Sequence, residues 1–515
     1  MPLTMLHKMP KSLGYSLLFG ILLVAAFLRF FHLTTTPPGL YCDEAMDGNN
    51  AVEAAETNHF QVFYIEDGGR EGLYVDIVAA IIKVWPVYEP WIIRLPAAIA
   101  GVLTVGGIYL LVAELFGDGQ GLLAAFLLAT SFWHIVFSRI GFRAVLAPLL
   151  LTWALYLLIK AFRSQKTSIS LIDAAFAGII YALGFYTYIA YRVTPLLFLL
   201  FIPFFRLKPG FWKKTALFII VTCIVAAPLG RYFVQHPSDF WGRIAMVSVI
   251  NTQNPLHDFA VNVATETLMF NYRGDNNWRH NVSRAPELFW PVGILFVLGI
   301  IVAIWSLRKS WRDRKAAAAI ADVTNAPDMF PPFALLLTFA WIILGLLPGA
   351  ASDDSVPHAL RSILALPPAM ILASLGGVWL YGIAKEHWRW PGALTKSIAI
   401  VFLAIVGVFG YVEYFVAWAK NPNVSASFTA DYLVLGDRIN ALPANTPKYI
   451  VVDPGDASVH GINVAAQTVM FITHSFTATD AAVVNIHYLQ TNETNSIPAE
   501  TPSVDIFYIE NIEPY

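Results

Sequence analysis

The feature that most constrains the fold of this chain is its series of long hydrophobic runs. A helix needs about 20 apolar residues to cross a lipid bilayer. Runs at or near this length occupy residues 12–31, 91–115, 119–138, 143–162, 170–189, 192–206, 214–233, 287–307, 330–350, 361–384 and 397–418. Charged residues make up only 13% of the chain, about half the fraction typical of soluble domains. The sequence therefore predicts an all-α polytopic membrane protein.

A twelfth run, 72–86, is shorter and contains Asp76 and Lys83. If this run does not cross the membrane, every basic cluster falls on the same side as Lys8 and Lys11, as the positive-inside rule requires. These clusters are Lys160/Arg163/Lys166, Arg206/Lys208/Lys213/Lys214, Arg308/Lys309/Arg312/Arg314/Lys315 and Lys385/Arg389/Lys396. We therefore predict about eleven spans, a cytoplasmic N-terminus, and an interfacial helix over 72–86.

This orientation places the first loop, 32–90, and a second large loop, 234–286, on the extracytoplasmic side. The first loop is expected to contain amphipathic juxtamembrane helices. The tail, 419–515, is richer in Asp, Asn, Thr and Pro. A helical pattern covers 430–441, and strand-like runs cover 448–452, 468–474, 482–489 and 505–510. We expect a transmembrane module over 1–418, followed by a small extracytoplasmic α+β domain.

Acidic residues gather in the first loop, where the first span leaves the membrane. Asp43 and Glu44 follow Pro37-Pro38-Gly39, and Glu66, Asp67 and Glu71 come before the next hydrophobic run. Asp43 stands at a predicted helix start, where it is either an N-cap or a functional carboxylate that acts as a general base. The second acidic group is open to a simpler interpretation as solvated loop charges.

Six arginines are expected at the outer membrane face, against the positive-inside trend. They are Arg29, Arg94, Arg139, Arg143, Arg192 and Arg361. Arginine forms bidentate pairs with phosphate, so such a cluster suits an anionic lipid headgroup such as a polyprenyl phosphate. Ion pairing inside the bundle, or snorkelling to the headgroups, is the alternative for two or three of them.

The outer segment 271–284 combines aromatic, acidic, amide and basic side chains, as sugar sites often do, although an ordinary polar loop fits equally well. Asn281, Asn423 and Asn492 begin N-x-S/T sequons, a pattern frequent by chance. No Cys/His spacing resembles a zinc site. The net charge of −2 lacks the basic excess that nucleic-acid binding needs.

Several short motifs, in this order and on this side of the membrane, resemble one known family. They are Arg29 at the end of the first span, Asp-Glu at 43–44, Gly-Arg-Glu-Gly-Leu-Tyr at 69–74, Arg-Leu-Pro-Ala at 94–97, Ser-Arg at 138–139, Tyr-Thr-Tyr with Arg192 at 186–192, Pro-His-Ala-Leu-Arg-Ser at 357–362 and Leu-Pro-Pro at 366–368. Over roughly residues 15–420 the chain resembles the GT-C glycosyltransferases of the protein O-mannosyltransferase and aminoarabinose transferase superfamily.

The resemblance implies a glycosyltransferase that takes a sugar from a polyprenyl-phosphate carrier and transfers it outside the cytoplasm with inversion. It implies that Asp43 accepts the proton of the acceptor, which is a protein, a lipid or a glycan. It also implies that arginines at the outer face neutralise the phosphate leaving group. With arginine supplying that charge no metal is needed, although some relatives of the broader fold use a divalent one.

Residues and resemblance together define three candidate groups. The candidate catalytic residues are Asp43, Glu44 and Glu71. The candidate contacts to the donor phosphate or sugar are Arg29, Arg70, Arg139, Arg143, Tyr188, Arg192, His358 and Arg361. The candidate contacts to the acceptor or sugar are Asp275, Trp278, Arg279 and His280.

The chain departs from the aminoarabinose transferases at two positions. Those enzymes carry an Arg three residues after the catalytic Asp, where this chain has Met46. They also carry an Asp after the Ser/Ala-Arg turn, where this chain has Arg143-Ala144. These differences argue against the aminoarabinose reaction itself and leave the general reaction class intact.

Two other functions are compatible with a chain of this kind. In a transporter or flippase, Asp43 and the arginines would line a substrate route, but such proteins usually show midplane charges and inverted repeats, and the sequence shows neither. A non-catalytic membrane scaffold that presents the 419–515 domain would leave the constellation of Asp43 and the arginines unexplained.

Overall fold

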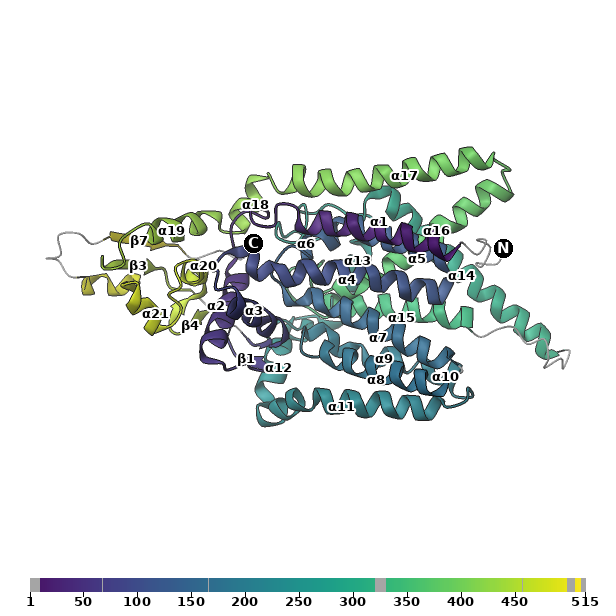
Figure 1. The fold of residues 1–515 in the computed structure, drawn as a ribbon, viewed down its shortest axis with the longest axis horizontal. Helices are drawn as coiled ribbons and strands as arrows, with labels where there is room; N and C mark the ends of the chain where they lie inside the picture. Colours follow the sequence, from purple (N-terminus) through teal and green to yellow (C-terminus); the bar gives the residue numbers. More distant parts are fainter. Residues whose placement is uncertain are drawn as a thin grey trace.

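The computed structural model describes residues 10–66, 68–164, 166–319, 330–455, 457–497 and 505–510. Lys8 and Asp67, both named above, lie outside these residues. The molecule is elongated (Figure 1): a bundle of helices forms one part, and the C-terminal strands and short helices extend from one end of it. Helix α1 (Lys11–Phe30) starts at the opposite end of the bundle and runs along it toward the C-terminal part (Figure 1).

In the described part of the chain, eight helical segments are long and apolar enough to cross a membrane. They are α1 (Lys11–Phe30), α4 (Pro90–Phe116), η1 with α7 (Arg143–Val145 and Leu146–Arg163), α11 (Phe211–Gln235), α14 (Trp290–Ala319), α15 (Phe330–Ala350), η5 with α16 (Ile363–Ala365 and Leu366–Glu386) and α17 (Gly392–Val412), which continues into the π-helical turn η6 (Glu413–Trp418). Each coincides with a predicted span.

The other three predicted spans are shorter or broken helices. Residues 119–138 form α5 (Asp118–Thr130) and α6 (Phe132–Phe137), which an extended Ser131 separates. Residues 170–189 correspond to α8 (Thr167–Gly184). Residues 192–206 form η2 (Ile189–Val193), α9 (Pro195–Phe198) and α10 (Phe201–Phe205). The predicted class, an all-α polytopic membrane protein with a small α+β domain, is confirmed.

The ambiguous run at 72–86 forms α3 (Leu73–Val84), a helix of 12 residues. A helix of that length measures about 18 Å, well short of the roughly 30 Å of a hydrocarbon core. Its apolar face, including Tyr74, Val78 and Ile82, is buried with α2 and α4 in one hydrophobic cluster. A short amphipathic helix against the bundle is the structure predicted for this segment.

The first loop also contains α2 (Cys42–Thr57) and the hairpin of β1 (Phe63–Tyr64) and β2 (Arg70–Glu71). The N-cap of α2 is Tyr41, and no side chain caps the helix. Asp43 is therefore a first-turn residue whose carboxylate does not cap the helix, and the interpretation of Asp43 as an N-cap is wrong. Gly72, directly after β2, donates to the carbonyl oxygen of Val62 at 3.0 Å, and only a glycine fits there, because a Cβ would collide with the carbonyl oxygen of Gln61.

The second large loop folds into α12 (Pro237–Met246), η3 (Val249–Asn251) and α13 (Pro255–Leu268). Ser248 forms an isolated antiparallel bridge with Ser352, and Asn262 donates to the carbonyl oxygens of Ala350 and Ser352. This loop is therefore held against the segment that follows α15.

The C-terminal region has a three-stranded parallel sheet in the order β6-β3-β7. The strands are β3 (Lys448–Val452), β6 (Ile486–Gln490) and β7 (Asp505–Ile509), with a separate pair β4 (Ser458–Val459) and β5 (Ile462–Asn463). The helices are α18 (Pro422–Ser427), α19 (Ala430–Asn440), η7 (Val464–Ala466), α20 (Gln467–Ile472), α21 (Ala478–Val483) and η8 (Thr491–Ser496). The predicted helix at 430–441 and the strands at 448–452 and 505–510 agree with the structure.

Two predicted strands in this region are wrong in whole or part. Of residues 468–474, 468–472 belong to helix α20, and Thr473 and His474 form the turn after it. The apolar run 469–472 is continuous rather than alternating, and all of it is buried on the helix. Residues 482–489 divide between the end of α21 and strand β6, with the change at Asn485, which has a left-handed φ of 56°.

The C-terminal region packs directly against α2. Met46 is fully buried in the same hydrophobic cluster as Ile450 and Val469 of that region. Asn49 donates to the backbone and side-chain oxygens of Gln467, at 3.0 and 2.8 Å. One face of the helix that carries Asp43 is thus covered by the C-terminal region, and removing residues 419–515 would expose it.

Candidate functional site

The candidate site is centred on the carboxylate of Asp43, at the start of α2. Its side chain is 39% exposed, and Oδ1 lies 3.4 Å from Nη2 of Arg70. Arg70 also lies 3.0 Å from Oδ1 of Asp47, one helical turn after Asp43. Arg70 and Asp47 are both buried. Burial raises the pKa of Asp47 above its usual range, although Arg70 lies beside it.

Glu71, next to Arg70 on β2, joins two further arginines to the site. Its Oε2 lies 3.6 Å from Nε of Arg143, and its Oε1 lies 3.2 Å from Nη2 of Arg192. Arg143 lies over the ring of Tyr188. Arg192 donates to the carbonyl oxygen of Phe240 and also lies over the Phe240 ring. Glu71, predicted as a catalytic residue, is thus buried and contacts both guanidinium groups, an arrangement that holds the two arginines in place.

Arg279 approaches the start of α2 from the 271–284 segment. Its guanidinium carbon lies 3.7 Å from the centroid of the Tyr41 ring, a close cation–π contact. Among the described residues Arg279 has no ion pair within 4.0 Å. Burial raises the pKa of the intervening Cys42 thiol to about 12, so this cysteine is not a thiolate nucleophile.

Glu44 was predicted as a catalytic residue, and the structure corrects this. Its side chain is completely buried, and it forms a bidentate pair with Arg94 at 3.0 and 3.1 Å. It also accepts a hydrogen bond from the backbone N–H of Gly141. Arg94 donates in turn to the carbonyl oxygens of Pro37 and Gly39. Glu44 therefore fixes α2 to α4 and cannot meet a substrate.

Arg29 and Arg139 were predicted to contact the donor phosphate, and both are completely buried structural residues. Arg29 donates to the carbonyl oxygens of Ala25 and Ala129 and contacts Nδ1 of His134 at 2.7 Å. Arg139 donates to three carbonyl oxygens at and after the end of α1: those of Leu28, Phe31 and Thr36. The carbonyl oxygens of Ala129 and Leu28 lie in the last turns of α5 and α1, where carbonyl groups lack intrahelical partners, so each arginine supplies a missing donor there.

Asp275, His280 and His358 form a buried cluster behind Arg279. Oδ2 of Asp275 lies 2.9 Å from Nδ1 of His280 and 3.8 Å from Nδ1 of His358. Burial opposes the charge of Asp275, but the two histidines outweigh it and place its pKa below the usual range. The three ligand atoms lie within 4.8 Å of one another, so these residues could hold a divalent cation. Among the described residues, Glu56, His474 and Asp480 in and against the C-terminal region form a second such group. Their burial argues against direct contact with an acceptor sugar.

Arg361 and Trp278, also predicted as site residues, contact residues outside the Asp43 region, Arg361 through its side chain and Trp278 through its backbone. Arg361 pairs with Asp354 at 3.0 Å, and Trp278 accepts a hydrogen bond on its carbonyl oxygen from Nε1 of Trp418. The structure therefore pairs Arg70 with Asp43, joins Arg143 and Arg192 to Arg70 through its neighbour Glu71, and places Arg279 over Tyr41. Arg361 lies outside this group of contacts.

Glu266 on α13 gives a pH prediction for the loop packing behind the site. It accepts hydrogen bonds from the backbone N–H of His358 and from Oγ of Ser362, and burial raises its pKa to about 7. Between its unfolded pKa of 4.5 and this folded value, only the folded state keeps the proton, so stability falls as the pH rises. Over this pH range the free energy of unfolding should fall by roughly 3 kcal/mol in total. Thermal unfolding from pH 5 to 8 should show this slope in the wild type and a flatter profile in Glu266→Gln; identical profiles would contradict it.

Two residues of the site escaped the sequence analysis. Asp47 is one turn after Asp43, and this i, i+4 carboxylate pair is a readable signal. Tyr41 gives no such signal, because only the tertiary structure brings Arg279 over its ring.

A family model described as dolichyl-phosphate-mannose-protein mannosyltransferase matches residues 76–229 of the chain. No curated protein sequence matches the chain significantly.

Solved structures give a wider similarity. The apo oligosaccharyltransferase of Archaeoglobus fulgidus has a TM-score of 0.52 at 14% identity, over 90% of this chain and 64% of that one. ArnT from Cupriavidus metallidurans bound to undecaprenyl phosphate also has a TM-score of 0.52, at 13% identity, over 94% of this chain and 90% of that one. This chain thus spans just under two thirds of the archaeal enzyme in the first match. The GT-C glycosyltransferase fold predicted from the sequence is confirmed.

Proposed function

We propose that this protein transfers a sugar from a polyprenyl-phosphate carrier to an acceptor on the extracytoplasmic side, with inversion at the anomeric carbon. The observation that carries the proposal is the partly exposed carboxylate of Asp43, which pairs with the buried Arg70. Glu71, next to Arg70, pairs with Arg143 and Arg192, and Arg279 lies over the ring of Tyr41 at the start of α2. The similarity to ArnT bound to undecaprenyl phosphate, and to the archaeal AglB in complex with a dolichol-phosphate and an inhibitory peptide, supports a lipid carrier of this kind.

In this mechanism Asp43 accepts the proton of the acceptor hydroxyl or amine as the oxygen or nitrogen attacks the anomeric carbon. The bond between that carbon and the phosphate oxygen breaks, and the electron pair leaves with the phosphate. Arg70 holds Asp43 and Asp47, while Arg143, Arg192 and Arg279 are the cations available to the leaving phosphate. Fixed cations at the point where charge develops stabilise the transition state.

The proposed sidedness has support in the position of the basic residues. Arg163 at the end of α7, and Lys208, Lys213 and Lys214 before and at the start of α11, lie at the end of these helices that is remote from α2. That distribution fits a cytoplasmic N-terminus and an extracytoplasmic site.

Purified protein tested with a panel of polyprenyl-phosphate sugars would examine this function directly. We expect transfer, or slow hydrolysis, from at least one donor, with an inverted product. Absence of both binding and turnover across the panel would refute the proposal and favour a transporter or scaffold.

Catalysis is expected without a metal, because the guanidinium groups supply the positive charge. Treatment with EDTA should change the transfer rate less than about twofold, whereas losing metal-based charge stabilisation removes several kcal/mol. The measurement is transfer before and after chelation, with Zn²⁺ or Mn²⁺ added back. Activity lost to EDTA, restored by metal and abolished by His280→Ala would contradict this expectation and assign the cation to Asp275, His280 and His358.

A further inference from the structure

A cavity of about 950 Å³ lies at the end of the bundle remote from Asp43. Helix α7 connects the two regions. Arg143 lies just before its start, and its last two residues, Phe162 and Arg163, line the cavity. Its 18 residues span roughly 27 Å, which is close to the thickness of a hydrocarbon core, about 30 Å. The cavity therefore lies near the opposite membrane interface and has no part in the chemistry proposed above.

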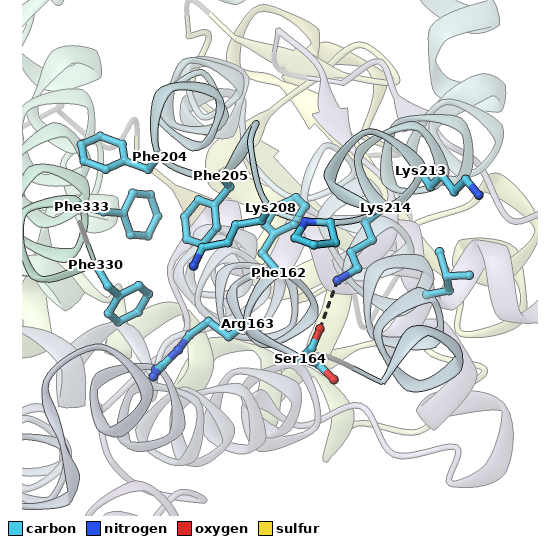
Figure 2. Close-up of a pocket in the computed structure, with 13 residues that line it drawn as sticks. Phe162, Arg163, Ser164, Phe204, Phe205, Lys208, Lys213, Lys214, Phe330 and Phe333 are labelled. Carbon is cyan, nitrogen blue, oxygen red and sulfur yellow. Dashed lines mark hydrogen bonds between the residues drawn. The ribbon is translucent and has the colours of Figure 1, made fainter. Parts of the chain in front are cut away.

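The described residues that line this cavity include four cations and no carboxylate. Lys208 extends between Phe205 and Phe330 toward Arg163, whereas Lys213 lies at the rim and points away (Figure 2). Lys214 is buried and donates to the carbonyl oxygens of Ala161 and Ser164, at 2.8 and 3.3 Å.

The cations of the cavity differ in whether a carboxylate of the protein already pairs with them. Arg163 is paired with Glu114 at 2.8 Å and lies 4.3 Å from the centroid of the Phe330 ring. Lys208 has no ion pair within 4.0 Å in the described part of the chain. Lys213 and Lys214 also have no ion pair within 4.0 Å among the described residues, but Lys213 points away (Figure 2) and Lys214 is held by two carbonyl oxygens. Lys208 is therefore the ammonium group best placed to meet an incoming anion.

The rest of the wall is aromatic and apolar, from Phe162, Phe204, Phe205, Phe330 and Phe333. Ile172 and Trp212, which are sequence neighbours of lining residues, are largely exposed apolar side chains, as expected on a lipid-facing surface. The volume is near the upper end of small-molecule sites, about 300–1,000 Å³, and far exceeds what a phosphate ion needs. Cationic pockets between spans at the cytoplasmic side suit lipid head groups.

We infer that this cavity binds an anionic phospholipid, with the phosphate near Lys208, Lys214 and Arg163 and the upper acyl chain against the phenylalanine wall. A lipid held there contacts the ends of α7, α11 and α15 together, so it ties three spans into one unit. This site is independent of the function proposed for Asp43.

Native mass spectrometry of the purified protein with phosphatidylglycerol and with phosphatidylcholine of the same acyl chains tests the inference. The wild type should retain phosphatidylglycerol more strongly. Lys208→Gln should weaken that binding about fivefold, since one interfacial cation contributes about 1 kcal/mol. Lys385→Gln, an exposed lysine of another basic cluster, is the matched control and should bind as the wild type does.

Thermal unfolding supplies a second readout that separates the two sources of phosphate. Phosphatidylglycerol should raise the unfolding temperature of the wild type and of Lys385→Gln more than that of Lys208→Gln. Equal retention of the two lipids, or equal loss in the two variants, would overturn the site. If inorganic phosphate alone raised the unfolding temperature as much as the lipid did, the ligand would be a soluble phosphate and the lipid assignment would be overturned.

Discussion

Asp43→Asn should lower the rate of sugar transfer by about 10²- to 10⁴-fold while leaving donor binding intact, because a positioned general base contributes that much to a rate. The asparagine has nearly the same shape and can still accept a hydrogen bond from Arg70, which keeps its second partner, Asp47, at 3.0 Å. The arginines assigned to the donor phosphate are not altered by the change. The measurement is single-turnover transfer, together with donor binding, on protein shown to be folded.

The control for this substitution is Asp258→Asn. Asp258 lies on α13, and its side chain is 37% exposed against 39% for Asp43. It contacts His257 at 3.0 Å and takes no part in the site. The control variant should transfer sugar at the wild-type rate. If Asp43→Asn kept more than a tenth of the wild-type rate, Asp43 would not be the base; equal losses in both variants would point to a general effect of the lost charge.

The fold was largely predictable because a membrane span requires a long run of apolar residues, which can be recognised in the sequence. Hydrophobic length was enough to locate the eight helical segments that are long enough to cross a membrane. The distribution of Lys and Arg led us to exclude 72–86, where the structure has a helix of 12 residues. The failures came where apolar runs lie outside the bundle. By periodicity alone, residues 468–474 are equally consistent with a buried helix and a buried strand. In the structure the apolar residues of this run form helix α20, which packs with Met46 of α2 in one hydrophobic cluster.

The sequence predicted some residues of the candidate site, such as Asp43 and Arg70, but neither the full set of residues nor the surroundings of each one. Glu44 and Asp43 are adjacent in the sequence, yet one carboxylate is fully buried against Arg94 and the other is 39% exposed. Successive residues on a helix point about 100° apart, so their surroundings depend on tertiary packing that the sequence does not display. The same holds for Met46, whose burial against the C-terminal region gives a packing reason for an apolar residue where aminoarabinose transferases carry Arg.

The pair of Glu44 and Arg94 leads to the largest expected effect on stability. Arg94→Met should destabilise the protein by about 3–5 kcal/mol, because it leaves a buried carboxylate without its partner. Glu44 would then keep only the backbone N–H of Gly141. The double variant Glu44→Gln/Arg94→Met should regain a large part of this loss, since it removes the buried charge while the glutamine amide oxygen can still accept from Gly141. Chemical or thermal unfolding of the wild type, the two single variants and the double variant in one detergent gives the double-mutant cycle.

Arg361→Met provides the matched control for that cycle. Its partner, Asp354, is 59% exposed, so water replaces the lost ion pair. Arg361 also donates to Oγ of Ser352 and to the carbonyl oxygen of Asp354, so the expected cost is about 1–2 kcal/mol, still below that of Arg94→Met. Equal losses in Arg94→Met and Arg361→Met would show that burial of the first pair has no special effect. A double variant no more stable than Arg94→Met would instead locate the loss in the two hydrogen bonds from Arg94 to the carbonyl oxygens of Pro37 and Gly39. In either case α2 would be held by something other than the charge pair, and Glu44 would not be the residue that fixes α2 to α4.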